Sequence, residues 1–368
     1  MDYALIGCGR VAPNHIKAAR ENGFHIAAVC DIDFRHIDAL FERAGLSEEE
    51  TQAIARYERY EEMLEKETLT LVSIALPSGL HAAAAKCVIA HGVNVIIEKP
   101  IAMSLPDADE IIRLGEEKGV VVSACHQNRF NLAVQAMRAA VEAGRFGALS
   151  NAAVTVRWSR GEDYYSHDDW RGKWASDGGT LMNQCIHGID LLRWMCGDEI
   201  KTVYGKTARQ YHPYIEAEDV GTAVIEFANG VLATVEGTVN VCGDDMEEHL
   251  TLLGKEGAVK LGGTCANEVL HWHFADDPED RQESVKEKTV NVYGNGHTAL
   301  FADVADAVRT GRQPYVDARA GRRALETVLA IYLSAKTGAP VSLPLSDVSS
   351  VDFEGLFENA AAEGRENA

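Results

Sequence analysis

The sequence predicts an α/β protein in which a doubly wound parallel sheet comes first and a large, mostly antiparallel open sheet follows. Three observations support this fold class. A short apolar strand at residues 3–6 runs directly into a glycine turn. Strands and helical stretches then alternate to about residue 125, which is typical of parallel sheets. Beyond residue 150, closely spaced segments alternate in hydrophobicity, as antiparallel strands do.

The first element is a strand, turn and helix unit. Residues 3–6 are apolar and residues 11–20 favour a helix. Between them Gly7 makes the tight turn, Gly9 lets the backbone approach phosphate groups, and Ala12 lets the helix pack close to the strand. This arrangement predicts a site for the pyrophosphate of a dinucleotide. The residues expected to bind it are Gly7, Gly9, Arg10 and Val11.

The second strand, residues 26–30, ends in Asp31, about 20 residues beyond the turn. A carboxylate there accepts hydrogen bonds from the adenosine ribose hydroxyls, and its charge repels a 2′-phosphate. We therefore expect NAD rather than NADP as cofactor, with Asp31 and Ile32 beside the ribose. Arg35 leaves NADP open as an alternative, and a helix N-cap is the structural alternative for Asp31.

The remaining elements of the first sheet are strands at 69–76, 93–97 and 120–125 and helices at 81–91 and 104–118. The carboxyl ends of parallel strands lie along one edge of a sheet, so the residues that follow them should line one crevice. Further cofactor-binding residues are expected there, and these are Pro77, Ser78, His81, Glu98, Lys99 and Gln127.

The second half of the chain predicts a different sheet, with a hairpin-like turn at 228–230. Its expected strands are 152–158, 200–210, 220–227, 231–239, 248–253 and 258–261. Helices are expected at 180–196, 299–309 and 318–337. The domains predicted are a cofactor-binding domain at 1–124, with a returning helical contribution from about 318–337, a substrate-binding and oligomerisation domain at 125–345, and a C-terminal tail at 346–368 that is polar after about residue 357.

Composition narrows the function classes. The chain has 368 residues and a formal net charge of −21, which opposes binding to nucleic acid or anionic membranes. Residue 1 leads directly into a strand, and no targeting or membrane segment is recognised, so a cytoplasmic protein is expected. Eight scattered cysteines without a Cys-x-x-Cys pair predict reduced thiols. His271 and His273 have no evident third ligand, so no metal is expected.

The predicted helix at 180–196 carries a second group of polar residues. Asn183, His187 and Asp190 are spaced so that they project from one helical face, with Gln184 beside them. A histidine that accepts a hydroxyl proton and a lysine that stabilises the developing alkoxide are what oxidation of a secondary alcohol requires. Lys99, His187, Asp190 and Asn183 are therefore the candidate catalytic residues. The structural alternative is that His187 satisfies local backbone and Asp190 is a surface carboxylate.

Taken together, these motifs resemble the Gfo/Idh/MocA family of sugar and polyol dehydrogenases over nearly the whole chain. The resemblance implies an N-terminal Rossmann domain and a C-terminal α/β domain. It also implies NAD-dependent hydride transfer, and dimers or tetramers built through the open sheet. The family's active-site lysine and histidine correspond to Lys99 and His187, and the Lys99–Pro100 bond is expected to be cis. The motifs that carry the resemblance are Gly7-x-Gly9-x-x-Ala12, Asp31, Pro77-Ser78-Gly79-Leu80-His81, Glu98-Lys99-Pro100, Gln127-Asn128-Arg129, Gly178-Gly179 and His187-x-x-Asp190.

One position departs from the family pattern. Many members carry an aspartate four residues before the histidine, whereas this chain has Asn183. An amide cannot be the charged partner in a proton relay, so Asp190 or Lys99 must supply any charge coupling. We expect Asn183 to orient the substrate, as donor and acceptor.

The aromatic and basic stretch at 158–184 is similar to that of bacterial enzymes that oxidise the C3 hydroxyl of UDP-N-acetylglucosaminuronic acid. Aromatic faces stack on sugar rings, and basic groups meet an anion. The expected substrate-binding residues are Arg129, Tyr165, Trp170, Arg171, Trp174, Asn183 and Gln184. For Trp170 and Trp174 a core position is an equal alternative. For the protein, the alternatives are a glycoside, free-sugar or inositol dehydrogenase and a non-catalytic NAD(H)-binding regulator.

Overall fold

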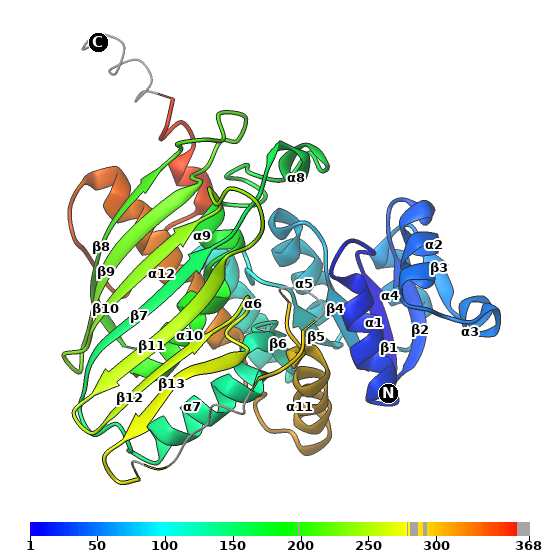
Figure 1. The fold of residues 1–368 in the computed structure, drawn as a ribbon. Coiled ribbons are helices and arrows are strands. Elements are labelled where there is room, and N and C mark those ends of the chain that lie inside the picture. Colours follow the sequence, from blue (N-terminus) through cyan, green and yellow to red (C-terminus); the bar gives the residue numbers. More distant parts are fainter. Residues whose placement is uncertain (198, 278, 280–285, 290–292, 359–368) are drawn as a thin grey trace. The chain divides into compact units, whose positions relative to one another are not determined.

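The computed structural model describes residues 1–197, 199–277, 279, 286–289 and 293–358 (Figure 1). Its internal contacts divide the chain into two compact units. Unit 1 comprises Met1–Ala102, Asp107–Gln127 and Gly296–Arg322, and unit 2 comprises Met103–Pro106, Asn128–Asn295 and the chain from Arg323 onward. The returning helix of unit 1 is thus α11 (Gly296–Thr310), whereas the sequence placed this contribution at about 318–337. The domain boundaries drawn from sequence stay a prediction.

Unit 1 contains the predicted doubly wound sheet. Six strands pair in the order β3-β2-β1-β4-β5-β6, and every neighbouring pair is parallel. The strand order reverses between β1 and β4, which is where open α/β sheets bind their ligands. The strands are β1 (Asp2–Ile6), β2 (His25–Cys30), β3 (Ala55–Tyr57), β4 (Leu71–Ile74), β5 (Asn94–Ile97) and β6 (Val122–Ala124).

The helices of unit 1 follow the expected alternation and add a region that the sequence reading left unassigned. Between β2 and β4 the chain forms three helices and the edge strand β3. Helix α2 is capped by the Asp33 side chain, which accepts a hydrogen bond from the Arg35 N–H. The helical elements are α1 (Ala12–Glu21), α2 (Phe34–Arg43), α3 (Glu48–Ala53), α4 (Tyr60–Lys66), η1 (Ser78–Leu80), α5 (His81–Ala90), α6 (Leu105–Lys118) and η2 (Gln127–Phe130).

Unit 2 is built on an eight-stranded sheet in the order β13-β12-β11-β7-β10-β9-β8-β14. All of its neighbouring pairs are antiparallel except β7 and β10, which run parallel, so the prediction of a mostly antiparallel sheet is confirmed. The strands are β7 (Leu149–Arg157), β8 (Ile200–Ala208), β9 (Val220–Phe227), β10 (Leu232–Thr238), β11 (Glu247–Gly254), β12 (Gly257–Gly262), β13 (Glu268–Phe274) and β14 (Val341–Ser342).

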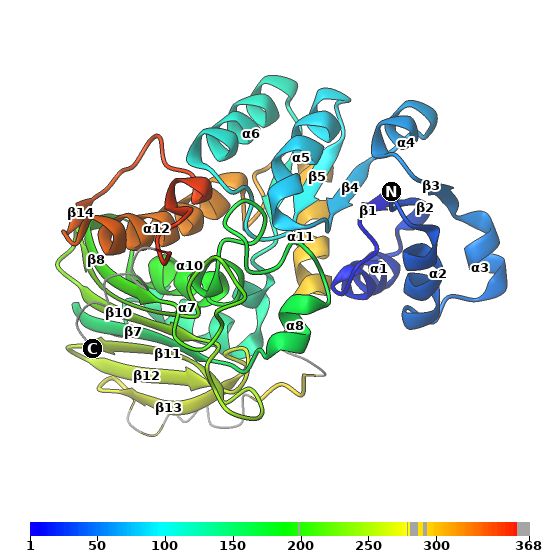
Figure 2. The ribbon, with the colours of Figure 1, turned by 90° about the horizontal axis from the view of Figure 1, so that it is seen from above.

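Helices of unit 2 cover one face of this sheet. Figure 2 shows α10 (Ile186–Cys196) and α12 (Ala318–Thr337) on the same side of the strands. Glycines on that face let the helices approach, because a Cβ at Gly205 would lie 2.7 Å from Ile331 of α12 and one at Gly237 would lie 2.5 Å from the Sγ of Cys185. The other helical elements of unit 2 are α7 (Leu132–Glu142), α8 (Glu162–Ser166), α9 (Thr180–Asn183) and η3 (Ser350–Phe353).

The predicted helix at 180–196 is two helices, α9 and α10. The N–H of Cys185 donates to the carbonyl oxygen of Thr180, five residues earlier, so the helical hydrogen-bond pattern widens here before α10 begins. Asn183 ends α9 and His187 is the second residue of α10. The prediction that Asn183 and His187 share the face of one continuous helix is therefore wrong.

The segment predicted as a C-terminal tail is partly packed. Phe353 in η3 is buried, and the Ser350 hydroxyl donates to the carbonyl oxygen of Trp174 over 2.6 Å. Residues 359–368 of that segment lie outside the described residues. No helix in the described part of the chain is both long and apolar enough to span a membrane.

Candidate active site

The glycine turn of unit 1 has the shape that a dinucleotide needs. Gly7 has φ +94°, and a Cβ there would lie 2.5 Å from the carbonyl oxygen of Ala75, so only glycine fits. A Cβ at Gly9 would meet nothing within 4 Å, which means that this backbone borders open space. Ala12 at the start of α1 is fully buried. The open side of the turn, at the N-terminus of a ten-residue helix, fits a pyrophosphate.

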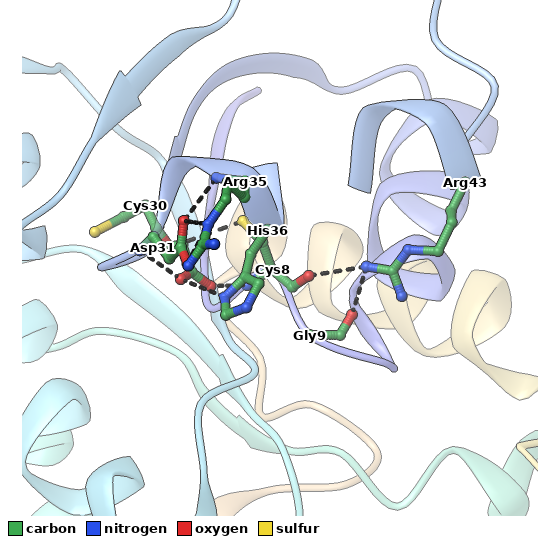
Figure 3. A network of polar contacts seen from close by, with 8 residues as sticks. Cys8, Gly9, Cys30, Asp31, Arg35, His36 and Arg43 are labelled. Carbon is green, nitrogen blue, oxygen red and sulfur yellow. Dashed lines mark hydrogen bonds and ion pairs between the residues drawn. The ribbon is translucent and has the colours of Figure 1, made fainter. Parts of the chain in front are cut away.

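Asp31 lies beside this turn, and its carboxylate is held by backbone and side-chain donors (Figure 3). One oxygen accepts the N–H of Cys8 over 2.8 Å, and the other accepts the N–H of Asp33 over 3.0 Å and lies 2.9 Å from Nδ1 of His36. Arg43 of α2 donates to the carbonyl oxygens of Cys8 and Gly9, which braces the turn. The carboxylate is thus fixed next to the phosphate position, where the ribose of a dinucleotide lies.

Arg35, the residue that left NADP as an alternative cofactor, is paired with Asp33. Its guanidinium contacts the carboxylate of Asp33 at 2.6 Å, and this hydrogen bond lowers the pKa of Asp33 to about 2. Ile32, next to Asp31, is 83% exposed, and its contact with the cofactor stays a prediction. A fixed Asp31 and a paired Arg35 favour NAD.

The predicted cofactor-binding residues at the other strand ends differ in what they contact. The two ring nitrogens of His81 lie 2.7 and 2.8 Å from the carbonyl oxygens of Pro100 and Leu76, so this side chain ties the lysine turn to the end of β4. These contacts give His81 a structural role, and its contact with the cofactor stays a prediction. Ser78 and Gln127 are buried, and Pro77 precedes η1.

Lys99 follows β5, and its peptide bond to Pro100 is cis, as the resemblance implied. The neighbouring Glu98 is buried, and its carboxylate accepts the Lys99 N–H over 3.2 Å. The charge of the Lys99 amine acts on His81 and Cys125, which places the amine in the same part of unit 1.

In unit 2, Asn183 belongs to a chain of polar side chains. Its amide donates to the carboxylate of Asp177, which also accepts the N–H of Gly172 over 2.7 Å. The Gln184 amide donates to the Asn183 carbonyl over 3.1 Å and to the Tyr164 hydroxyl over 3.0 Å. The sequence thus placed Asn183 and Gln184 correctly side by side, but the charged group next to the asparagine is Asp177.

Arg171 joins this chain from the other end. Its guanidinium donates to the Tyr164 hydroxyl and, over 2.8 Å, to the carboxylate of Asp168. It also stacks over the rings of Tyr164 and Trp170, at 4.2 and 4.6 Å from their centroids. A cation between two aromatic rings, followed by two amides, is a surface suited to a polar ring with an anionic substituent.

Arg129 and Asp190 form a buried ion pair. Nε and Nη2 of Arg129 donate to both carboxylate oxygens of Asp190, over 2.7 and 2.6 Å. The guanidinium also lies over the ring of Trp194. Asp190 is thus a buried partner of Arg129 and not the surface carboxylate of the structural alternative. A substrate contact by Arg129, and charge coupling to His187 by Asp190 or Lys99, stay predictions. His187 itself is 6% exposed.

The predicted aromatic substrate contacts divide between surface and core. Trp174 is fully buried against Tyr332 and Phe353, so it is a core residue and not a substrate contact. Trp170 is half-buried, and Tyr165 is buried with its ring edge-on to Tyr164. Tyr164 and Asp177 were missed as site residues. The Asp177-Gly178-Gly179 turn just before Asn183 was the available signal.

Two family profiles match this chain. The NAD-binding Rossmann fold of the Gfo/Idh/MocA oxidoreductase family matches residues 1–126, and the C-terminal alpha/beta domain of the same family matches residues 138–343. The chain belongs to the Gfo/Idh/MocA family. It is an NAD-dependent oxidoreductase, and the expectation of NAD as cofactor is confirmed.

Solved structures and curated relatives of the family agree on this class. The WlbA dehydrogenase of Bordetella pertussis, in complex with NADH and UDP-GlcNAcA, is 34% identical with a TM-score of 0.86, over 94% of this chain and 98% of that one. WlbA of Chromobacterium violaceum, with the same ligands, is 33% identical with a TM-score of 0.83, over 94% and 96%. The D-apiose dehydrogenase of Paraburkholderia graminis is 27% identical over 92% of this chain and 89% of its own length. The three proteins reported above are thus all dehydrogenases of a sugar or a nucleotide sugar.

Proposed function

We propose that this protein oxidises a secondary ring hydroxyl, at C3, of a UDP-linked N-acetylated sugar or uronate. The observation that carries the proposal is the chain from Asp177 through Asn183, Gln184 and Tyr164 to Arg171, which combines amide donors and acceptors with a stacked cation. Amides suit the hydroxyl and acetamido groups of such a sugar, and the guanidinium suits its carboxylate or phosphates. The similarity to the two WlbA dehydrogenases supports the same class.

The residues have separable roles in this proposal. His187 accepts the proton of the reacting hydroxyl, and the Lys99 amine stabilises the developing alkoxide. Asn183 orients the sugar, with its amide fixed by Asp177. Gly7, Gly9 and Asp31 hold NAD, which supplies the acceptor for the hydride. Asp177 takes the place of the family aspartate that Asn183 replaces, because it brings a carboxylate to the same amide.

A sugar without a nucleotide is the second candidate. The similarity to D-apiose dehydrogenase over most of both chains favours it. The two candidates differ in what Arg171 must bind, because a free pentose or an inositol carries no anionic group.

Turnover assays distinguish these substrates. Reduction of NAD is followed by absorbance while UDP-N-acetylglucosaminuronate, free aldoses and inositols are supplied in turn. We expect reduction with the UDP-sugar and at least a tenfold lower kcat/KM with uncharged sugars. Faster turnover of a free sugar would refute the nucleotide-sugar proposal and support the second candidate.

Two substitutions test the roles. Lys99→Ala and His187→Ala should each lower kcat by at least about 1,000-fold while the Kd for NAD stays within about threefold. Lys17→Ala and His91→Ala, at exposed positions, are the matched controls. Undiminished turnover in either site variant would refute the role assigned to that residue.

We further propose that the chain forms dimers or tetramers through the open sheet. The strand register places Tyr204, Val224, Leu232 and Leu253 on the face opposite the glycines that contact α9, α10 and α12, and all four side chains are at least 39% exposed. Light scattering of the purified protein tests this, and Val224→Lys should shift the population towards monomer. A monomeric wild-type protein would refute the proposal.

A further inference from the structure

Four buried polar side chains converge in the core of unit 1. They are His15 of α1, Glu98 after β5, Cys125 after β6 and His297 of α11. Their nitrogen, oxygen and sulfur atoms all lie within 4.8 Å of one another. Two helices and the ends of two strands, distant in sequence, therefore meet at the residue that precedes Lys99. The roles described above use none of His15, Cys125 or His297.

Glu98 is the centre of this cluster. Oε1 accepts a hydrogen bond from Nε2 of His15 over 2.8 Å, and Nε2 of His297 lies 3.6 Å from the same oxygen. Oε2 accepts the backbone N–H of Lys99 over 3.2 Å. The contact between His297 and Glu98 is longer than a hydrogen bond and acts through charge and dipole. Both oxygens of the carboxylate are thus held, one by the two histidines and one by the lysine's own backbone.

The short contact also bears on whether the cluster is a metal site. Two ligands at about 2.0–2.1 Å from a tetrahedral zinc lie roughly 3.3 Å apart. His15 and Glu98 are 2.8 Å apart, which is the separation of directly bonded donor and acceptor. The geometry is that of a hydrogen-bonded clamp.

The charges of the neighbouring groups make Glu98 the negative member of the cluster. Burial alone would raise the pKa of its carboxyl, but the hydrogen bond from His15 and the nearby ring of His297 outweigh burial and hold that pKa well below its ordinary value. Burial lowers the pKa of His297 and of His81 on α5, which disfavours a positive charge on either ring. Burial raises the pKa of the Cys125 thiol and of the Tyr3 hydroxyl on β1, so both stay protonated.

We propose that His15 and His297 are positioning residues, which lock Glu98 as a fixed negative charge so that the Lys99 amine stays protonated and keeps one direction. This inference rests on the proposed role of Lys99. The observed contact is the hydrogen bond from the Lys99 backbone N–H to the carboxylate. In this proposal, a fixed negative charge one residue away also favours the protonated form of the amine.

The packing of the histidines makes the clamp rigid. The rings of His15 and His297 meet edge to face at 5.4 Å, and Phe301 of α11 meets the ring of His15 in the same way at 5.6 Å. Helix α1 begins at the dinucleotide turn. The clamp therefore joins the helix that would receive the cofactor phosphates to the turn that carries the lysine.

The test measures Lys99 without any substrate. The full chain is labelled with an amine-reactive reagent across a pH series, and the Lys99 peptide is quantified by mass spectrometry. His15→Phe removes the donor and keeps the volume, whereas His15→Gln keeps an amide N–H donor. We expect His15→Phe to lower the apparent pKa of the Lys99 amine by about one unit and His15→Gln to restore most of it. His25→Gln, at an exposed histidine paired with Asp2, is the control.

Turnover and stability separate positioning from a structural role. His15→Phe should lower kcat at least tenfold while the KM for NAD changes less than threefold. If it fails to fold, His297→Phe, which removes the longer contact, should shift the Lys99 profile in the same direction by less. An unchanged profile in a folded variant overturns the proposal. So does a stoichiometric metal in the purified protein whose removal unfolds unit 1. Retained turnover in Lys99→Ala would refute only the role of Lys99, because the labelling profile is read independently.

Discussion

Glu98 of unit 1 and Glu248 of unit 2 are both buried glutamates on or beside a strand, yet their carboxyls have opposite pKa shifts. Glu98 has His15 within hydrogen-bond distance and His297 close by, and its pKa lies well below the ordinary value. Glu248 lies at the start of β11 against Gly188 of α10, and burial raises its pKa to about 8. Both glutamates are buried to a similar extent, so the hydrogen-bond donors around each carboxyl decide whether it is charged.

Glu218 extends the comparison within unit 2. Burial raises its pKa to about 8, although the Leu181 N–H and the Tyr332 hydroxyl contact Oε1 at 2.7 and 2.8 Å. The Tyr332 hydroxyl also lies 2.5 Å from the carbonyl oxygen of Gly178. A hydroxyl has one proton, so a neutral Glu218 that donates to Tyr332, which then donates to Gly178, satisfies all three groups. The raised pKa values of about 8 favour the neutral form of Glu218 and Glu248 at pH 7, whereas the lowered pKa of Glu98 favours its charged form.

The largest expected effect is at Glu98. Glu98→Gln replaces a carboxylate by an amide whose N–H groups face the His15 donor, and we expect a loss of about 4 kcal/mol in the free energy of unfolding at pH 7. Glu248→Gln is the matched substitution in unit 2 and should cause no loss at pH 7, because the folded carboxyl is already held neutral and only the unfolded glutamate is ionised. Urea unfolding measures both, and equal losses would break the comparison.

The pH dependence of stability distinguishes the same two residues. Because the pKa of Glu248 rises from about 4.5 unfolded to about 8 folded, the folded state holds an extra proton between these values, and stability falls as pH rises through this window. Glu98, with its folded pKa lowered, behaves in the opposite way: its contribution is present above about pH 4.5 and is lost as pH falls through the folded pKa.

Glu248→Gln should therefore gain about 1.4 kcal/mol of stability over the wild type for each pH unit between the two pKa values, or about 3.5 kcal/mol between pH 5 and 8. Thermal unfolding of both proteins across this range measures the difference. A constant difference would mean that Glu248 is ionised when folded.

Sequence reasoning succeeded where a backbone turn or a strand determines position. The glycine turn, Asp31 and Lys99 were placed correctly because each follows a strand of a parallel sheet, and the sheet itself fixes where strand ends lie. The eight-stranded sheet was largely readable as well, since its strands alternate between a helix-covered and an exposed face.

The errors lie where side chains choose among partners. Nothing in the local spacing indicates that Asp190 would bind Arg129, which lies 61 residues earlier in the chain. The break between α9 and α10 is equally invisible, because residues 183–187 are compatible with a continuous helix. A tryptophan such as Trp174 is equally typical of a protein core and of a sugar-binding site. Only its contacts with Tyr332 and Phe353 show that it belongs to the core.

A smaller effect tests the hydrogen bonds that run from Glu218 through Tyr332 to Gly178 in unit 2. Tyr332→Phe removes the link between Glu218 and Gly178 and should cost about 2 kcal/mol in the free energy of unfolding. In the Glu218→Gln background the same substitution should cost less, because the two groups share one hydrogen-bond chain. A double-mutant cycle by urea unfolding measures this coupling. Additive losses would show that Tyr332 acts through Gly178 alone.

The smallest expected effect concerns Asp31, a carboxylate of unit 1 that lies near the surface. Its oxygens accept the N–H groups of Cys8 and Asp33, so donors rather than burial fix its position, as for Glu98. Asp31→Asn removes the charge that repels a 2′-phosphate and should lower the preference for NAD over NADP about tenfold, or about 1.4 kcal/mol. Binding titrations with both cofactors measure this ratio, and Asp38→Asn, at an exposed carboxylate of α2 paired with Arg56, is the control. An unchanged ratio would show that selectivity resides in the backbone of the turn. In that case Glu98, beside Lys99, would be the one carboxylate of this comparison in unit 1 whose fixed position matters for function.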